Sequence, residues 1–190
     1  FQLRKDEVIN ILFSWSLEER KWIVSFCRSA AKLLELNPKT QVIFCWKFWW
    51  SNNANFKLSK EEVLSYFPDC MRDRTVFLGL VPYEKMPNVY KHVDICIYPS
   101  LYDNYPWVVI ESLLMWKAVI ASQNTGIKEA VKEWIIYVLP EDVEWIVSEA
   151  QWLIDNRERR EELWNRWFSS VNSLNSDIMS DFIWYYSGIK

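Results

Sequence analysis

The sequence predicts an α/β protein built on a doubly wound parallel sheet, and two observations lead to this prediction. First, short apolar runs without polar alternation recur through the chain, at 8–13, 41–45, 75–79, 94–100 and 118–122. Such runs are typical of strands that are buried on both faces of a parallel sheet. Second, longer amphipathic stretches separate them, and this alternation builds a sheet that helices cover on both sides.

In the segments between these runs, apolar residues recur at helical spacing. The pattern predicts helices over 18–36, 59–67, 84–92, 107–115, 127–133, 142–154 and 157–171. The segment "IIYVL" at 135–139 predicts a sixth strand. We see no internal repeat and no low-complexity linker, and 190 residues suffice for one well-buried domain. We therefore expect a Rossmann-like domain over residues 1–172 and a helical tail over 173–190, with its helix at 176–187.

Composition excludes several classes of protein. The net charge is -3, with Lys and Arg spread along the chain, which argues against a nucleic-acid partner. The four cysteines show no C-x-x-C spacing, and Cys45 and Cys96 lie inside apolar runs, as core thiols of a reducing cytoplasm do. No run approaches the roughly 20 apolar residues of a membrane span. We expect a cytoplasmic protein, and a start without Met indicates a piece of a longer chain.

Tryptophan is abundant where glycine is scarce. The chain has 13 Trp and 3 Gly, whereas average usage predicts about 13 glycines in a chain of this length. Trp116 stands between "ESLLM" and "KAVIAS", where a helix turns into a strand and a residue with positive φ, normally glycine, is needed. We hypothesise that many of these tryptophans are UGA-encoded glycines in the source organism, as in some uncultivated bacterial lineages. The alternative is a Trp-rich core or a carbohydrate-stacking surface.

Three stretches follow predicted strands and therefore lie at the carboxyl edge of the sheet, where such folds bind ligands. They are 14–22, 46–53 and 99–107. If Trp15, Trp46, Trp49 and Trp50 are glycines, two of these loops can bring backbone N–H groups close to a phosphate.

The third stretch carries the most specific pattern. In "PSLYDNYPWVVIESLLMWKAVIAS", Asp103 precedes Glu111 by eight residues. The segment resembles the C-terminal, donor-binding domain of the GT-B glycosyltransferases of group 1, family four, whose E-x7-E signature has two acidic residues at this spacing. Trp116 falls on a glycine of the family pattern. "NTGIKEAV" at 124–131 resembles the G-G-I-x-E-x-V element that follows.

Two upstream segments extend the resemblance, which covers about residues 8 to 170. "SWSLEERKWI" resembles G-R-L-x-x-x-K-G: Trp15 and Trp22 fall on its glycines, Ser16 replaces its Arg, and Lys21 is retained. "RTVFLGLVPYEKMPNVYKHVDICIYPS" is similar to the strand–loop–helix–strand that surrounds the nucleotide base.

The resemblance implies a nucleoside diphosphate sugar as donor. It assigns the donor sugar to Asp103 and the ribose to Glu111, the two catalytic candidates, and the diphosphate to Lys21, a point charge suited to phosphate. From the residues alone, Lys21 also fits a solvated charge and Asp103 a turn residue. The other substrate-binding candidates are Trp15, Ser16, Leu80, Asn104, Tyr105, Pro106 and Trp107. No metal and no separate cofactor are implied, because cations and helix N–H groups can stabilise the leaving diphosphate.

The expected function is the donor half of a retaining hexosyltransferase with a glycan or lipid-linked acceptor. The acceptor domain would precede this chain, and the full protein would stay in the cytoplasm, with peripheral association at the inner face of the membrane as a further option. Two alternatives stay open. One is a nucleotide-sugar epimerase of the same fold. The other is a degenerate, non-catalytic binding module, which Ser16, Asp103 and the tryptophans at glycine positions favour.

Overall fold

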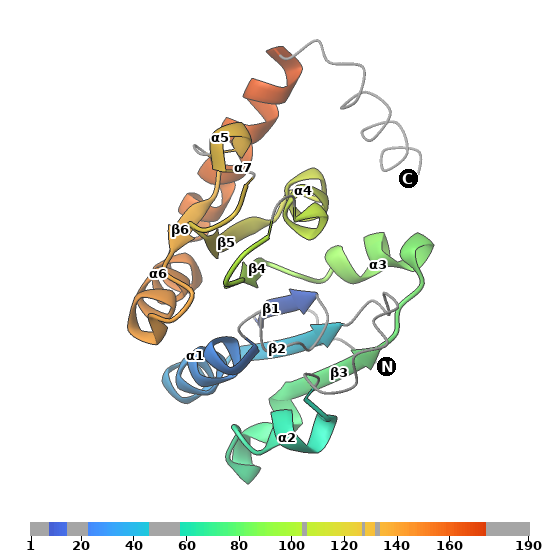
Figure 1. Ribbon diagram of the computed structural model, residues 1–190, viewed down its shortest axis with the longest axis vertical. Helices are drawn as coiled ribbons and strands as arrows, with labels where there is room; N and C mark the ends of the chain where they lie inside the picture. Colours follow the sequence, from blue (N-terminus) through green and yellow to red (C-terminus); the bar gives the residue numbers. More distant parts are fainter. Residues whose placement is uncertain are drawn as a thin grey trace.

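The structure is a computed structural model that describes residues 8–14, 23–45, 58–103, 106–126, 128–131 and 134–173. It contains a six-stranded sheet in the order β3-β2-β1-β4-β5-β6, in which every neighbouring pair is parallel (Figure 1). The strands are β1 (Ile9–Ser14), β2 (Thr40–Cys45), β3 (Thr75–Gly79), β4 (Ile95–Tyr98), β5 (Ala118–Ser122) and β6 (Ile136–Val138). This order reverses beside β1, so the predicted doubly wound α/β fold and its sixth strand are confirmed.

Helices connect consecutive strands in the described parts of the chain. The α-helices are α1 (Ile23–Leu36), α2 (Lys60–Leu64), α3 (Met86–Tyr90), α4 (Trp107–Leu114), α5 (Lys128–Val131), α6 (Val143–Asp155) and α7 (Arg157–Ser173). Two 3-10 helices, η3 (Asp69–Arg74) and η4 (Tyr83–Lys85), precede β3 and α3. The helix predicted at 176–187 lies outside the described residues.

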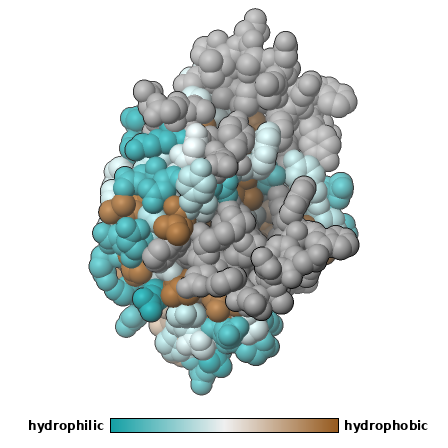
Figure 2. All heavy atoms as spheres, in the orientation of Figure 1, coloured by the Kyte–Doolittle hydropathy of each residue, from teal (hydrophilic) through white to brown (hydrophobic). Residues whose placement is uncertain are grey.

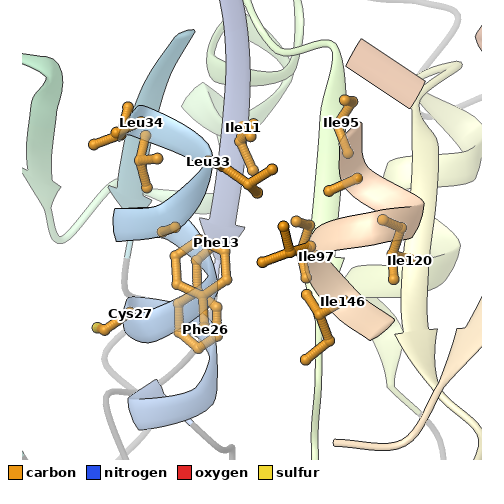
Figure 3. Close-up of a cluster of buried hydrophobic side chains, with 14 of the residues drawn as sticks. Ile11, Phe13, Phe26, Cys27, Leu33, Leu34, Ile95, Ile97, Ile120 and Ile146 are labelled. Atoms are coloured by element: carbon orange, nitrogen blue, oxygen red, sulfur yellow. The ribbon is translucent and has the colours of Figure 1, made fainter. Parts of the chain in front are cut away.

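Alternate strand residues point to opposite faces of the sheet, so the core has two layers. One layer packs α1 and α6 against the sheet and contains Ile11, Phe13, Phe26, Leu33, Phe44, Ile97, Ile120 and Ile146 (Figure 3). Phe13 and Phe26 meet there with ring centroids 4.7 Å apart. The other layer packs α3 and α4 and contains Leu12, Ile43, Met86, Tyr90, Cys96, Val109 and Val119. The apolar runs lack alternation because both faces are buried.

The predicted helix at 59–67 is shorter in the structure. Ser59 caps α2 in a reciprocal capping box: its Oγ accepts the Glu62 N–H at 3.1 Å, and its own N–H donates to Glu62 Oε2 at 2.6 Å. The α-helix ends at Leu64, and Pro68 then leads into η3. Proline disfavours the helical conformation in the residue that precedes it, so a helix cannot continue through Phe67 into Pro68, although the amphipathic pattern runs through Phe67.

The connection from α4 to β5 is a Schellman turn. The Trp116 N–H donates to the Leu113 carbonyl at 2.9 Å, and the Lys117 N–H donates to the Ser112 carbonyl at 3.0 Å. Trp116, at the centre of the turn, has a φ of 62°, and among the described residues it is the non-glycine residue with positive φ. The positive φ predicted at the junction is therefore confirmed.

Apolar side chains are dispersed over the described part of the face that Figure 2 shows. In Figure 2 hydrophilic residues dominate the described surface of this view, and hydrophobic ones form small separate patches. Within the described ranges, none of the helices combines the length and the apolar character needed to cross a bilayer.

Candidate functional site

The loop that follows β4 is joined to the loop that follows β5. Asp103 forms an isolated parallel bridge with Thr125, and the Gly126 N–H donates to the Asp103 carbonyl at 2.9 Å. The Asp103 side chain is half-buried. Both loops leave the carboxyl ends of neighbouring strands. The backbone at Asp103 is therefore held at the sheet edge where doubly wound folds bind their ligands.

Glu111 lies on the second turn of α4 and is almost fully buried, with 3% of its surface exposed. The Tyr90 hydroxyl, from α3, donates to Glu111 Oε2 at 3.3 Å. A buried carboxylate is costly unless it accepts hydrogen bonds, so this phenol supports the carboxylate in its position. The contact joins the helix before β4 to the helix after it.

A second pair of buried hydroxyls lies beside this contact. Tyr98 Oη and Ser112 Oγ are 2.8 Å apart, and the Ser112 hydroxyl donates to the Val108 carbonyl at 2.7 Å. Burial raises the pKa of Tyr90 well above its usual value, and the neighbouring Glu111 carboxylate raises it further. Burial likewise raises the pKa of Tyr98. Both phenols therefore keep their protons and act as hydrogen-bond donors.

The amino end of α4 faces the same edge as Asp103. Pro106 precedes the helix and is buried, and Trp107 in its first turn is 50% exposed. Within the described residues, no side-chain hydrogen bond caps this turn. Its N–H groups and the positive end of the helix dipole favour an anion here.

Leu80 lies farther along the same edge of the sheet. It follows Gly79, whose φ is 65°, and its side chain is 58% exposed. β3 is separated from β4 by β2 and β1. Three strand spacings amount to about 14 Å. A ligand that contacts both Leu80 and the Asp103 loop must therefore be extended.

Two hydroxyls at this edge are buried and make no hydrogen bond within the described structure, namely Ser14 Oγ at the end of β1 and Thr125 Oγ1 in the loop after β5. Unpaired buried hydroxyls are uncommon, and they often mark a place where water or a ligand binds. Ser14 directly precedes the segment that resembles the G-R-L-x-x-x-K-G element.

Some of the predicted site residues fall within the described structure. Asp103, Pro106, Trp107 and Glu111 share one strand–loop–helix unit, and Leu80 lies three strands away. The remaining candidates lie outside the described residues: Trp15, Ser16, Lys21, Asn104 and Tyr105.

Sequence reasoning missed Tyr90, Ser14 and Thr125. A serine at the last position of the first strand could have indicated Ser14, but no local pattern places the Tyr90 phenol beside Glu111. Among the described residues, no group of three His, Cys, Asp or Glu side chains could hold a metal ion.

The comparisons with known proteins agree with the fold described above. An uncharacterized glycosyltransferase of Methanocaldococcus jannaschii is 24% identical over 182 residues, which are 95% of this chain and 43% of that protein. The fold is similar to that of a sucrose-phosphate synthase from Thermosynechococcus elongatus, with a TM-score of 0.75 and 23% identity over 90% of this chain and 42% of that one.

A third protein matches over most of its own length. It is the C-terminal domain of a glycosyl transferase group 1 family protein from Francisella tularensis, with a TM-score of 0.71 and 17% identity over 90% of this chain and 87% of that one. The chain thus spans less than half of the first two proteins but nearly all of this single domain. Residues 1–166 match the family described as glycosyl transferases group 1, and the chain belongs to that family.

Proposed function

We propose that this chain is the donor half of a glycosyltransferase that takes its sugar from a nucleoside diphosphate sugar. One observation carries the proposal: the buried Glu111 carboxylate and the Asp103 loop belong to one strand–loop–helix unit at the carboxyl edge of the sheet. Carboxylates accept hydrogen bonds from hydroxyl groups, of which a sugar nucleotide has several on its ribose and on its sugar.

The layout of the edge supports an extended donor. Leu80 lies about 14 Å from the Asp103 loop, taken as three strand spacings. In our proposal the base lies near Leu80, the ribose near Glu111 and the sugar near Asp103. The diphosphate between them faces the amino end of α4, where N–H groups and the helix dipole favour negative charge. Lys21 supplies a cation to the same group.

We further propose transfer with retention of configuration to a glycan or lipid-linked acceptor. The acceptor would bind to a preceding domain, since the chain spans only 43% of its curated relative. The full protein would act in the cytoplasm or at the inner face of the membrane. No cofactor beyond the donor is needed if N–H groups and cations carry the charge of the leaving diphosphate.

The first experiment measures binding by calorimetry. Uridine, guanosine and adenosine diphosphates and their glucose derivatives are titrated into the chain, and the matching nucleosides serve as controls. The same titrations are made on a variant with glycine at Trp15, Trp22, Trp46 and Trp116. We expect one base to be bound as its diphosphate. If neither protein binds any of these compounds, the degenerate module replaces the proposal.

A second experiment tests the reaction with the full-length protein. Proton NMR of the product gives the anomeric configuration, and an axial donor bond that stays axial is the expected result. An inverted product contradicts retention but not transfer. Interconversion of the nucleotide sugar without any acceptor would instead identify the epimerase alternative.

A further inference from the structure

Tyr90, a side chain that supports Glu111, belongs to a different helix, and its hydroxyl contacts the Glu111 carboxylate directly. Tyr90 is fully buried on α3, and its hydroxyl donates to Glu111 Oε2 at 3.3 Å. Twenty-one residues separate the two side chains along the sequence. A glutamate side chain has several rotatable bonds, so a fixed partner is needed to hold its carboxylate in one orientation.

The neighbouring hydroxyls determine which way the protons point. Ser112 donates its proton to the Val108 carbonyl, so its oxygen is the acceptor for Tyr98. The Tyr98 proton is therefore committed to Ser112. The Tyr90 hydroxyl also lies within hydrogen-bonding reach of Ser112 and Tyr98, and it donates its proton to Glu111 Oε2 at 3.3 Å, because the carboxylate is the charged acceptor of the three. Because burial keeps both phenols protonated, this arrangement persists at any pH near neutrality.

We infer that Tyr90 is a positioning residue, which orients the Glu111 carboxylate to accept hydrogen bonds from the ribose hydroxyls of the donor. This inference rests on the proposed function. Tyr90 itself is fully buried and does not touch the ligand, so it acts through Glu111. Its loss should affect recognition of the ribose and leave the contacts of the base and the diphosphate in place.

The test compares two ligands on each variant. One ligand is the nucleoside diphosphate that the parent binds, and the other is its 2′,3′-dideoxy analogue, which lacks the hydroxyls that Glu111 would bind. In the parent, the ribose form should bind at least about tenfold more tightly, as expected for hydrogen bonds to a charged group. In Tyr90→Phe this preference should fall to about twofold, while the affinity for the dideoxy analogue stays the same.

Two further variants separate positioning from a general structural effect. Glu111→Leu, whose side chain has no acceptor, should lose most of the preference by itself, and Tyr90→Phe added to it should change nothing more, because the phenol would no longer have an acceptor to orient. Tyr137→Phe is the matched control: it removes another phenol that donates a 3.3 Å hydrogen bond, to the Lys128 carbonyl, away from Glu111. It should keep the full preference of the parent.

Each outcome decides one question. A parent that binds neither ligand removes the proposed function and this inference with it. A parent that binds both ligands equally leaves diphosphate binding in place but overturns the role of Glu111 at the ribose. A full preference in Tyr90→Phe overturns the role of Tyr90 alone. If Tyr90→Phe lacks a cooperative melt, Tyr90→Met fills the same space without a donor and is measured in its place.

Discussion

The Lys117 N–H donates a 3.0 Å hydrogen bond to the Ser112 carbonyl, and this bond encloses Trp116 at a φ of 62°. The same turn in other helices normally contains glycine, because a Cβ is unfavourable in the left-handed region. The indole is 59% exposed and meets the Trp164 ring edge-on, with centroids 5.4 Å apart. The backbone at this position therefore has the left-handed conformation that glycine favours.

The strain at Trp116 can be measured by comparing two substitutions. Trp116→Gly and Trp116→Ala both remove the indole and its contact with Trp164, and they differ only in the Cβ. We expect the glycine variant to be more stable by about 1 kcal/mol, because the left-handed conformation costs a residue with a Cβ roughly 1–2 kcal/mol. Denaturant unfolding of both variants gives the difference. An alanine variant of equal or higher stability would show that φ is not positive there.

The codon at position 116 tests the recoding hypothesis separately. We propose that it is UGA, as at positions 15 and 22, and UGG at all three would refute the hypothesis. Other tryptophans occupy positions with an ordinary backbone conformation. Trp107 starts α4 and Trp134 precedes β6, and neither is a positive-φ residue. At these two positions the structure does not require glycine.

Lys21→Ala should weaken binding of the nucleoside diphosphate and leave binding of the nucleoside nearly unchanged. A charge-assisted hydrogen bond to phosphate contributes about 1.5–3 kcal/mol, which corresponds to a loss of affinity of roughly 10- to 150-fold. Lys91→Ala, which removes an exposed lysine after α3, is the control and should bind as the parent does. Equal diphosphate affinity in Lys21→Ala and in the parent would exclude the contact.

The cysteines should differ sharply in reactivity. Cys70 is exposed, whereas Cys27, Cys45 and Cys96 are buried and all four are free thiols. Burial raises the pKa of Cys96 to about 11 and lifts that of Cys27 well above its usual range, so neither forms the reactive thiolate near neutral pH. A thiol reagent should label Cys70 alone in the native protein and all four in denaturant. Rapid native labelling in Cys70→Ser would contradict the packing described here.

The capping box of α2 should weaken in acid. Two hydrogen bonds with Ser59 lower the pKa of Glu62 below 4.5. The bond from the Ser59 N–H has the larger effect, and the bond with the Ser59 hydroxyl has the smaller one. Because the pKa of this carboxylate is lower in the folded protein than in the unfolded chain, its ionised form stabilises the fold at pH values above the unfolded pKa. This stabilisation is lost as the pH falls through the folded pKa. NMR titration should therefore show Glu62 protonating below pH 4.5 together with faster amide exchange in α2. Ser59→Ala should move the pKa part of the way back, since the backbone donor remains.

The fold was predictable because its signals are local. Each buried strand is an apolar run, and the turn at Trp116 follows from one helix ending directly before one strand. The predicted helix at 59–67 was too long, because the amphipathic pattern continues through Phe67 while Pro68 redirects the backbone into η3.

The site was predictable only in part. The spacing of Asp103 and Glu111 reveals the acidic pair, since both lie on one continuous segment. The contact of Tyr90 with Glu111 and the bridge of Asp103 with Thr125 join separate segments. They depend on how α3 packs against α4 and how the loop after β4 meets the loop after β5. Periodicity in one sequence carries no record of such packing.

The Schellman turn also restricts how the length of this chain can vary. α4 ends at Leu114 and β5 begins at Ala118, so the connection is short. The hydrogen bond from Lys117 to Ser112 spans it and fixes its length. An inserted residue would either break that bond or shift β5 out of register between β4 and β6, which would turn buried side chains to the wrong face. Natural length variation and engineered insertions should therefore be found around the exposed residues 68–70 and be absent from 115–117.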